Sequence, residues 1–467
     1  MTSKTILGMI DACGMELLLF CAVWILIGAI DDVATDLYFA AYRIRRWFVR
    51  YRRTARMRST ELPPPQHPGQ IAVFVAAWQE AGIVGDMLAG CTRAWKDESY
   101  RLYVGCYGND ADTVAEVVRA AAANPAIRVV LNTRRGPTTK ADCLNRLWRA
   151  LLQDERAQKF RAKAIALHDA EDLVHSDEIR IFDTLIERKA LIQLPVLPLR
   201  VEGSHWVSGH YCDEFAESHT KQMVVREALG VGLPSSGVGC AFSRDMLEKI
   251  ALHYPDGPFD ATSLTEDYEL GLKISQHGGQ GMMVRMRDAN GQVVGTRAFF
   301  PATLQDAVRQ KSRWITGIAL AGWDRMGWTG SWREIWMRLH DRRGIFSALV
   351  LFAAYLALML EGLVMASATL GLYEPQPLGP LLSILLPVNA LLLCWRLAMR
   401  AFFVGRLYGI REALRSIPRS VVSNIIAILA ARRAVFAYTR HWLGHPLRWE
   451  KTRHIAPPKE GWMLNGA

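Results

Sequence analysis

The sequence predicts an α/β domain built around a parallel sheet, with membrane-associated helices before and after it along the chain. Three observations predict this arrangement. Short β-type runs alternate with helix-type segments between about residues 70 and 170, long apolar runs stand near both ends, and arginine-rich patches adjoin those apolar runs. A chain of 467 residues exceeds what one hydrophobic core usually organises, so we expect two or three structural units.

The alternation that predicts the sheet begins after a stiff, proline-rich linker at 63–69. Strand-type runs are expected at Ile71–Ala76, Arg101–Cys106, Ile127–Leu131 and Ala164–Leu167. Helices are expected between them, at about Ile83–Ala94, Thr113–Ala122 and Lys140–Gln153. Strand, helix and strand at this spacing are typical of parallel α/β sheets.

The first apolar run, Leu17–Ile30, would reach only ~21 Å as a helix, less than a hydrocarbon core of ~30 Å. A cleaved signal peptide is the alternative, but it would need basic residues before the run, whereas the arginines here follow it. We therefore expect an uncleaved anchor that tilts little and thins the bilayer locally.

Two further spans are expected at Ile345–Leu372 and Leu378–Trp395, the second kinked at Pro387. Glu361 interrupts the first of them. A carboxylate in a span is costly unless it faces protein or water, so it marks either an exit path or the outer end of its helix.

A last apolar segment, 420–437, starts just after Pro418, a residue that often opens helices. It contains Arg432 and Arg433. A helix that is apolar on one face and basic on the other lies at the membrane surface, so we expect an interfacial helix rather than a fourth span.

The net charge of +11 is concentrated in two patches. Arg43–Arg58 holds eight arginines and no acid, and Arg396–Arg419 holds six arginines against Glu412, which leaves −2 on the rest of the chain. Both patches adjoin apolar runs, which favours a membrane surface and excludes nucleic acid as a partner. By the positive-inside rule they place the intervening domain in the cytoplasm.

The expected organisation is thus a membrane anchor with an arginine-rich segment (1–62), a cytoplasmic domain (63–340), and a membrane hairpin with an interfacial helix (341–467). Apolar residues make up 51% of the chain and charged residues 22%, which excludes a disordered chain. Its eight cysteines form no C-x-x-C pair, so we expect neither a zinc site nor a disulfide framework, and a reduced compartment fits.

Ligands of parallel sheets bind beyond the carboxyl ends of the strands, so the residues after each run are the candidates for chemistry. Asp169 and Glu171 follow the fourth run, where two carboxylates could hold Mg²⁺ or Mn²⁺ together with phosphate oxygens. The alternative is an acidic turn in contact with solvent. Asn109 and Asp110 follow the second run; they either cap a helix or hold a base or ribose.

Three later segments also start or form helices. Lys140, with Asn145 five residues further on, precedes a helix whose first N–H groups would suit a diphosphate, although a lysine there is often an ordinary surface residue. Glu266 and Asp267 follow Thr265, and acids at a helix start also need no catalytic explanation.

Gln310, Arg313 and Trp314 share one helix face because they stand at positions i, i+3 and i+4. Arginine can clamp phosphate oxygens, and a tryptophan ring can stack on a sugar. The alternative is an amphipathic helix that docks on the membrane-proximal rim.

The order of these segments resembles that of one family. DAED at 169–172, GVGCAF at 237–242, TED at 265–267 and QKSRW at 310–314, followed by paired spans, resemble the membrane-bound family 2 glycosyltransferases with the GT-A fold, over about residues 70 to 450. The GT-A fold is a Rossmann-like α/β fold. HDAED, the stretch from Trp206 to His219 and WEKTRH at 449–454 resemble one branch, the bacterial inner-membrane glycosyltransferases of the phage-adsorption-protein-B type, linked to exopolysaccharide production.

The resemblance implies a role for each motif. Asp169 and Glu171 would bind the metal and the diphosphate, with Glu171 where the family normally has Asp. Asp267 would be the general base, next to Glu266. The remaining roles are contacts to the acceptor end and the diphosphate (Gln310, Arg313 and Trp314) and contacts to the donor nucleotide (Asn109, Asp110, Lys140 and Asn145).

The resemblance implies an inner-membrane, inverting transferase that moves a sugar from a UDP-sugar to a growing exopolysaccharide. Two alternatives stay open: a single transfer to a lipid acceptor, and an inactive signalling or receptor module that retains the fold. An outer-membrane export partner and a regulator that responds to cyclic dinucleotides are the expected partners besides donor, acceptor and membrane lipids.

Overall fold

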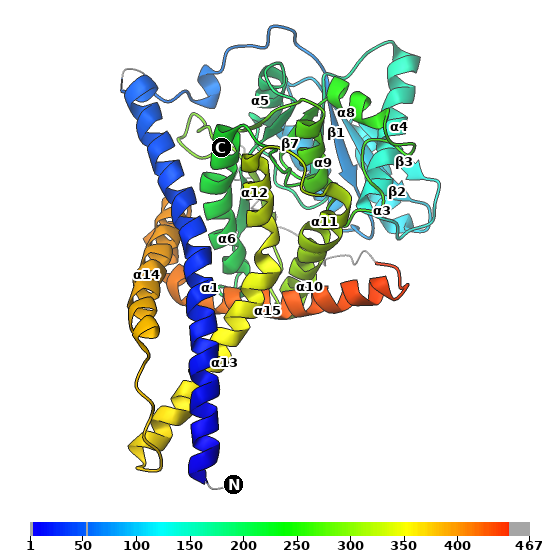
Figure 1. The fold of residues 1–467 in the computed structure, drawn as a ribbon. Coiled ribbons are helices and arrows are strands. Elements are labelled where there is room, and N and C mark those ends of the chain that lie inside the picture. Colours follow the sequence, from blue (N-terminus) through cyan, green and yellow to red (C-terminus); the bar gives the residue numbers. More distant parts are fainter. Residues whose placement is uncertain (1–2, 53–54, 448–467) are drawn as a thin grey trace.

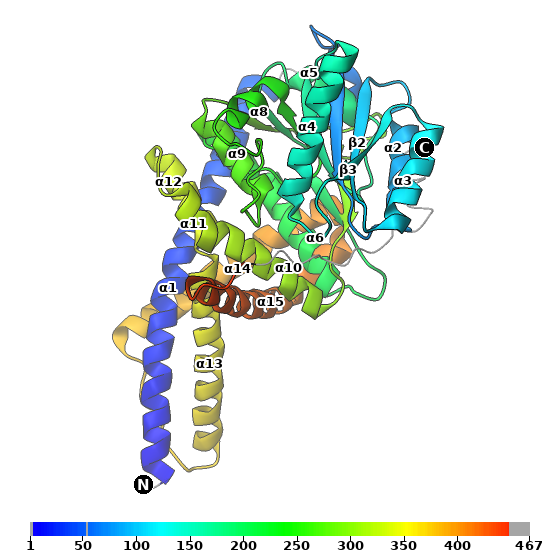
Figure 2. The same ribbon diagram turned by 90° about the vertical axis from the view of Figure 1, so that its right-hand side faces the viewer.

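The computed structural model of the chain describes residues 3–52 and 55–447. An α/β domain occupies one end of the molecule, and long helices project from it in one direction (Figure 1, Figure 2). The WEKTRH stretch at 449–454 lies outside the described residues, as does Arg53 of the first arginine patch.

The central sheet has seven strands in the order β3-β2-β1-β4-β7-β5-β8. These strands are β1 (Ile71–Ala76), β2 (Tyr100–Tyr107), β3 (Ile127–Asn132), β4 (Ala164–Asp169), β5 (Leu191–Gln193), β7 (Cys240–Ser243) and β8 (Gly281–Met283). The first four are parallel, and β7 runs antiparallel to both of its neighbours. A second, two-stranded parallel sheet pairs β6 (Val196–Leu199) with β9 (Thr296–Phe299). The predicted strands are therefore confirmed, with β4 extended to Asp169.

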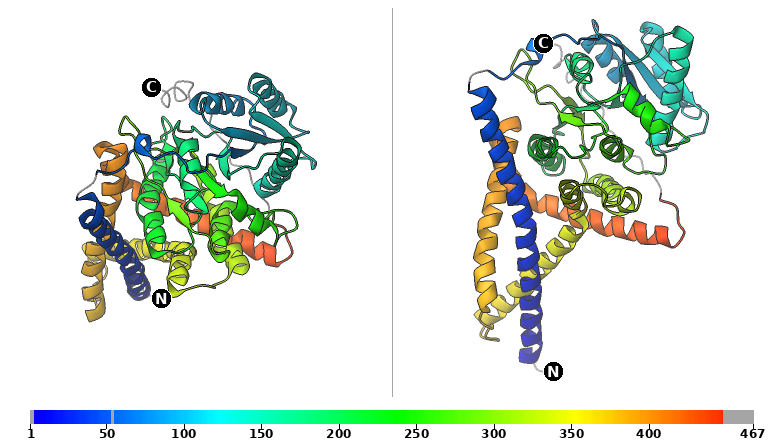
Figure 3. Two further views of the ribbon diagram at one scale, coloured as in Figure 1. Left: turned by 90° about the horizontal axis from the view of Figure 1, so that it is seen from above. Right: turned by 45° about the horizontal axis from the view of Figure 1, so that its top comes forward.

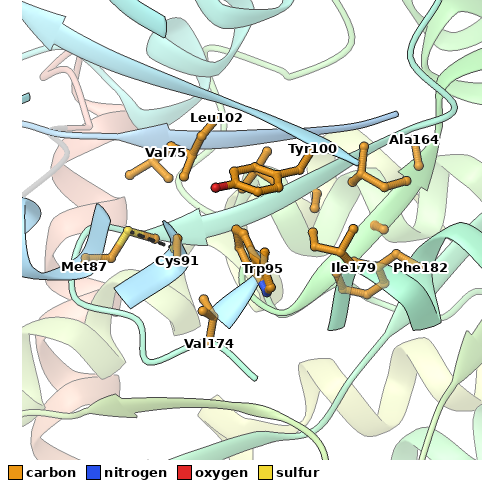
Figure 4. Close-up of a cluster of buried hydrophobic side chains, with 14 of the residues drawn as sticks. Val75, Met87, Cys91, Trp95, Tyr100, Leu102, Ala164, Val174, Ile179 and Phe182 are labelled. Atoms are coloured by element: carbon orange, nitrogen blue, oxygen red, sulfur yellow. Dashed lines mark hydrogen bonds between the residues drawn. The ribbon is translucent and has the colours of Figure 1, made fainter. Parts of the chain in front are cut away.

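Helices cover both faces of the large sheet, which is why its central strands are continuous apolar runs. They are α2 (Val84–Ala94), α3 (Ala111–Ala123), α4 (Lys140–Gln158), α5 (Glu178–Leu185), α8 (Arg244–Ala251) and α9 (Glu266–Gln276). Strand β1 serves both cores: Val73 and Val75 face one, and Ala72 and Phe74 the other. Figure 4 shows the first core, where Trp95 packs between the sheet and α5.

The second half of the domain is mainly helical. Its helices are α6 (Val207–Glu217), the π-helix η3 (Ser218–Gln222), α7 (Met223–Leu229), α10 (Leu304–Ile315), the π-helix η4 (Thr316–Leu320), α11 (Ala321–Met326) and α12 (Trp332–Arg342). Two short turns, η1 (Trp47–Tyr51) and η2 (Ser59–Glu61), lie before the sheet.

In the part of the chain that the structure describes, four helices are long and apolar enough to cross a membrane. They are α1 (Ser3–Arg46), α13 (Gly344–Thr369), α14 (Pro380–Tyr408) and α15 (Ile410–Trp442). The prediction of a short first helix is wrong, because α1 continues far beyond the apolar run in both directions. Its acidic residues Asp31 and Asp32 are tolerated because arginines of other elements pair with them.

The last helix lies across the others (Figure 1, Figure 2). It packs against α6 and α10 of the α/β domain as well as against α14. Its length and composition would also allow α15 to cross a membrane, so its expected interfacial position stays a prediction. Its predicted start after Pro418 is wrong: α15 begins at Ile410, because Gly409 (φ +85°) makes the turn from α14 and Pro418 lies inside the helix.

A buried ionic cluster joins the α/β domain to the membrane helices. Lys221 of η3 is 2% exposed and lies 2.5 Å from Asp36 of α1 and 2.6 Å from Glu217 of α6. Arg396 of α14 lies 2.8 Å from Asp32 and 3.7 Å from Glu217. Because buried charges are stable only when they are paired, this cluster fixes the domain against α1 and α14.

Replacing Lys221 should test this joint. Lys221→Met leaves the carboxylates of Asp36 and Glu217 buried with less compensation, and we expect a loss of about 3–5 kcal/mol of stability. Thermal unfolding in detergent, followed by tryptophan fluorescence, measures the change. The control Lys96→Met removes an exposed lysine and should leave the unfolding temperature unchanged; equal unfolding temperatures of the two variants would contradict a stabilising role.

Candidate active site

A cavity of about 320 Å³ opens at the carboxyl ends of β1, β2 and β4. Its floor consists of residues that end or follow these strands, Trp78, Tyr107 and Asp169. The start of α9, the QKSRW face of α10, and α6 with η3 form the walls. Parallel α/β sheets bind their ligands at this edge, and the volume suits a small-molecule ligand.

The DAED turn contributes three acids to the cavity lining, Asp169, Glu171 and Asp172. Asp172 also supports the turn: its Oδ2 accepts the N–H of Asp169 (3.0 Å) and lies 2.9 Å from His168 Nδ1. His168 Nε2 lies 3.1 Å from Glu178. Burial alone would lower the pKa of His168, but Glu178 and Asp172 outweigh burial and raise it to about 10. His168 is therefore an imidazolium that holds this turn in place.

Lys140 stands at the start of α4 and forms an ion pair with Asp169. Burial acts to lower the pKa of Lys140, but Asp169, Glu266 and Asp267 raise it overall. Lys140 therefore stays positively charged beside the carboxylates of the cavity. This position places a cation between the DAED turn and the start of α9.

Glu266 and Asp267 open α9 and both line the cavity. Thr265 precedes them at the cap position but makes no side-chain capping bond, whereas Asp267 Oδ1 accepts the N–H of Tyr268 (2.8 Å). Burial, and then Asp267, raise the pKa of Glu266 to about 7; burial also raises that of Asp267. Gly237 (φ +73°) faces Asp267, and a Cβ there would come within 2.2 Å of Asp267 Oδ2.

Gln310, Arg313 and Trp314 line the opposite wall from one face of α10. Within the described part of the chain, Gln310 Oε1 and Arg313 Nε are buried and have no hydrogen-bond partner. Buried polar atoms of this kind usually have a partner, so these two atoms are available to a bound ligand. Trp314 packs against Tyr211 and Phe215, with ring centroids 6.2 and 6.4 Å apart.

The cavity also has lining residues to which the sequence analysis assigned no role. Trp78 packs edge-on against Tyr107 (centroids 5.2 Å apart), and Tyr107 Oη lies 2.7 Å from Thr138 Oγ1. Trp78 follows β1 as Asp169 ends β4, so the same strand-end rule could have identified it.

Residues 213–219 (DEFAESH) supply the other end of the cavity, with Glu214, Phe215 and His219. His219 Nδ1 accepts the N–H of Val196 (3.0 Å), and Nε2 lies 3.2 Å from Ser236 Oγ. Burial, and then Arg285, lower the pKa of His219 to about 3, so the ring is neutral and its Nε2 carries the proton.

Three predicted donor contacts lie outside the cavity lining and bond to the backbone instead: Asn109, Asp110 and Asn145. Asp110 Oδ2 accepts the N–H of Gln79 (2.6 Å), and Asn145 bonds both backbone groups of Phe259 (2.6 and 3.1 Å). Asn109 bonds both backbone groups of Gly136. Asn109 and Asp110 therefore shape the loops that carry Trp78 and Thr138.

Asp169 and Glu171 are also the residues that fit a metal. Asp169 retains 34% exposure of its side chain, and both carboxylates line the cavity. Hard oxygen ligands suit Mg²⁺ or Mn²⁺, which take their remaining ligands from water and phosphate.

Residues 67–317 match the family model described as "Glycosyltransferase like family 2". The match covers more than half of the chain and includes the DAED turn, the start of α9 and all of α10. The chain belongs to this family. Its α/β domain with long apolar helices is the GT-A-like architecture that the sequence predicted.

Among curated proteins, bacteriophage adsorption protein B of Escherichia coli is 36% identical over 463 residues, or 94% of this chain. The relative from the O157:H7 strain gives the same identity and coverage. The chain spans 62% of the length of these relatives. Among solved structures, the fold is similar to that of the mannosyltransferase PcManGT of Pyrobaculum calidifontis in complex with GDP-Man and Mn²⁺ (TM-score 0.50, 14% identity, 90% of this chain and 99% of that one).

A methyl group at Gly237 should disable this family 2 site without unfolding the protein. Gly237→Ala forces Asp267 away from its position, so we expect at least a tenfold loss in release of nucleoside diphosphate from a nucleotide sugar. The control Gly278→Ala has a similar backbone (φ +83°) with nothing within 4 Å of the new Cβ. Both variants should lose about 1 kcal/mol of stability; equal activity of the two would contradict the placement of Asp267.

Proposed function

We propose that the protein is an inverting glycosyltransferase that moves one sugar at a time from a nucleotide sugar to an acceptor hydroxyl. One observation carries the proposal: four carboxylates, Lys140 and the Gln310–Trp314 face, which are far apart in sequence, line the same cavity at the carboxyl edge of the sheet. A retained fold without activity would not need all of these groups to converge.

The cations of the cavity would bind the donor diphosphate. Arg313 presents an unbonded Nε from one wall, and Lys140 presents its ammonium from the other. Fixed positive charges stabilise the negative charge that grows on the departing diphosphate. When bound, a divalent ion at Asp169 and Glu171 would neutralise part of the same charge.

Asp267 would act as the general base. The acceptor oxygen attacks the anomeric carbon, the bond from that carbon to the diphosphate oxygen breaks, and the hydroxyl proton passes to the Asp267 carboxylate. A single displacement of this kind inverts the configuration of the anomeric carbon. Glu266, beside Asp267, would raise the basicity of the pair by like-charge repulsion.

The donor would lie with its base near Trp78 and Tyr107, whose rings offer a stacking surface. The similar mannosyltransferase structure holds GDP-Man and Mn²⁺, which supports a nucleotide-sugar donor with a divalent metal. We propose a UDP-sugar as donor. A thermal-shift screen of UDP- and GDP-sugars, with and without Mn²⁺, tests both the base and the metal.

The acceptor would enter along the aromatic wall of Phe215, Phe300 and Trp314, which suits stacking on successive sugars of a growing exopolysaccharide. The arginine patches support a cytoplasmic catalytic domain at a bacterial inner membrane. A lipid acceptor is the second candidate, because α10, which carries the Trp314 wall, packs on α15, a helix long and apolar enough to cross a membrane. Product length with radiolabelled donor separates the two: a ladder of sizes supports the polymer, and a single lipid-linked sugar supports the lipid.

Asp267→Asn should abolish transfer while donor binding persists. Loss of the base should lower kcat by about 10²–10⁴-fold, with nucleoside diphosphate affinity within about threefold of the wild type. The control Asp97→Asn, at an exposed carboxylate, should retain full activity. Retained sugar transfer by Asp267→Asn would rule out this base.

The pH profile offers an independent test. Because burial raises the pKa values of Glu266 and Asp267, the base becomes protonated at a higher pH than an ordinary Asp, whose pKa is about 4. We expect kcat to fall on acidification with an apparent pKa well above that ordinary value. Lys140 opposes this rise, so the residual rate of Lys140→Met should have its acid limb at higher pH still. An acid limb near pH 4 in the wild type would contradict the assignment.

A further inference from the structure

A second group of cations lies outside the catalytic cavity. Its five members are the arginines Arg43, Arg56, Arg285, Arg287 and Arg406, which we call the Arg cluster. They come from α1, from the segment before η2, from the loop between β8 and β9, and from the end of α14. The proposed reaction uses none of them.

Hydrogen bonds hold the segment before η2 against the loop between β8 and β9. Ser59 N donates to Arg287 O (2.8 Å), and Arg58 Nη1 donates to Ala289 O (2.9 Å). The segment with Arg56 is therefore fastened to the loop with Arg285 and Arg287. Figures 1 and 3 show this loop beside the C-terminal end of α1.

Aromatic packing brings the two long helices together at the same place. Phe39 of α1 packs edge-on against Phe403 of α14, with centroids 5.8 Å apart. Arg43 Cζ lies 5.8 Å from the Phe39 ring, and Arg406 Cζ lies 5.6 Å from the ring of Phe402. The two guanidinium groups thus flank one aromatic contact, next to the loop that carries Arg285.

Within the described ranges, none of the five guanidinium groups has a carboxylate oxygen within 4.0 Å. Several buried cations of the domain do have one, as Arg226 and Arg244 show. Burial, and then the charges of Arg43 and Arg406, lower the pKa of Arg285 to about 10. Arg43 and Arg285 are half-buried and the other three are exposed, so the cluster concentrates positive charge at a position that a dissolved anion can reach.

The position of the cluster bears on whether its anion is a lipid headgroup or a dissolved phosphate compound. Arg43 lies eleven residues beyond Asp32 on α1, or about 17 Å along the helix axis. Asp32 pairs with Arg343 at the start of α13, where the membrane part begins. The cluster therefore lies on the side of Asp32 that adjoins the α/β domain, away from α13.

We propose that the Arg cluster is a binding site for a soluble ligand with two or more phosphate groups. Guanidinium groups bind phosphate oxygens through paired N–H donors, and several of them together match a polyphosphate chain. Arg285 also donates to His219 O (2.9 Å) and Thr220 Oγ1 (2.6 Å). The ligand would thus lie beside η3, to which Arg285 is bonded and whose His219 lines the catalytic cavity.

Calorimetric titration of the purified full chain with inorganic tripolyphosphate tests the site. The protein is held in nanodiscs of neutral phosphatidylcholine, without divalent metal. Tripolyphosphate should bind the wild type, and Arg43→Gln/Arg406→Gln should lose at least tenfold in affinity. The control Arg93→Gln/Arg119→Gln removes two exposed arginines of α2 and α3 and should bind as the wild type. Arg313→Gln, in the catalytic cavity, should retain this binding.

Equal affinity of the wild type and Arg43→Gln/Arg406→Gln would overturn the proposal. So would a tenfold loss in Arg313→Gln alone, since the catalytic cavity would then be the binding site. A third contrary result is weaker binding of the double variant to phosphatidylglycerol vesicles with unchanged tripolyphosphate affinity, which would assign the cluster to lipid. If the double variant is unstable, Arg287→Gln/Arg406→Gln, at two exposed positions, replaces it under the same criteria.

Discussion

Compensation of buried charge is the constraint on which this structure depends. The catalytic cavity holds the carboxylates of Asp169, Glu171, Glu266 and Asp267, and such a group could not persist at an apolar sheet edge alone. Lys140 and Arg313 supply opposite charge from two helices, and the His168 imidazolium supports the turn from below. The edge of the sheet thus positions the carboxylates, and helices α4 and α10 supply the positive charges that compensate them.

The same constraint governs the attachment of the domain to the membrane helices. Lys221, Asp36 and Glu217 are buried together although they belong to three different elements. Ionic pairs of this type contribute little net stability, but they tolerate few alternative arrangements. They therefore specify the orientation of the α/β domain on α1 and α14 more sharply than apolar packing would.

Much of the fold follows from the sequence because local patterns determine it. Strands β1 to β4 agree with the predicted runs to within two residues, since buried parallel strands are apolar throughout. The cavity-lining positions of Asp169, Asp267 and Arg313 also follow, because each stands at the end of a strand or on a helix face of clear periodicity. The chemical roles of these residues stay predictions.

Other features depend on partners that are distant along the chain. The length of α1 was underestimated because Asp31 and Asp32 look like an end to a membrane helix, and only the arginines of α13 and α14 show why the helix continues. Asn109 and Asn145 have the residue types of ligand contacts, but their amides satisfy nearby backbone groups. Trp78 could have been found because it follows the end of β1, but His219 carried no local signal that separates it from an ordinary core residue.

Helix α15 has a consequence of another kind. Arg419, fully buried, lies 2.6 Å from Glu412 on its own helix and 3.3 Å from Asp213 of α6. Glu214, the next residue, lines the cavity. A helix long and apolar enough to cross a membrane is thereby connected, through one guanidinium, to the helix that forms a wall of the cavity. A displacement of α15 would therefore be transmitted to α6 and change the position of Glu214.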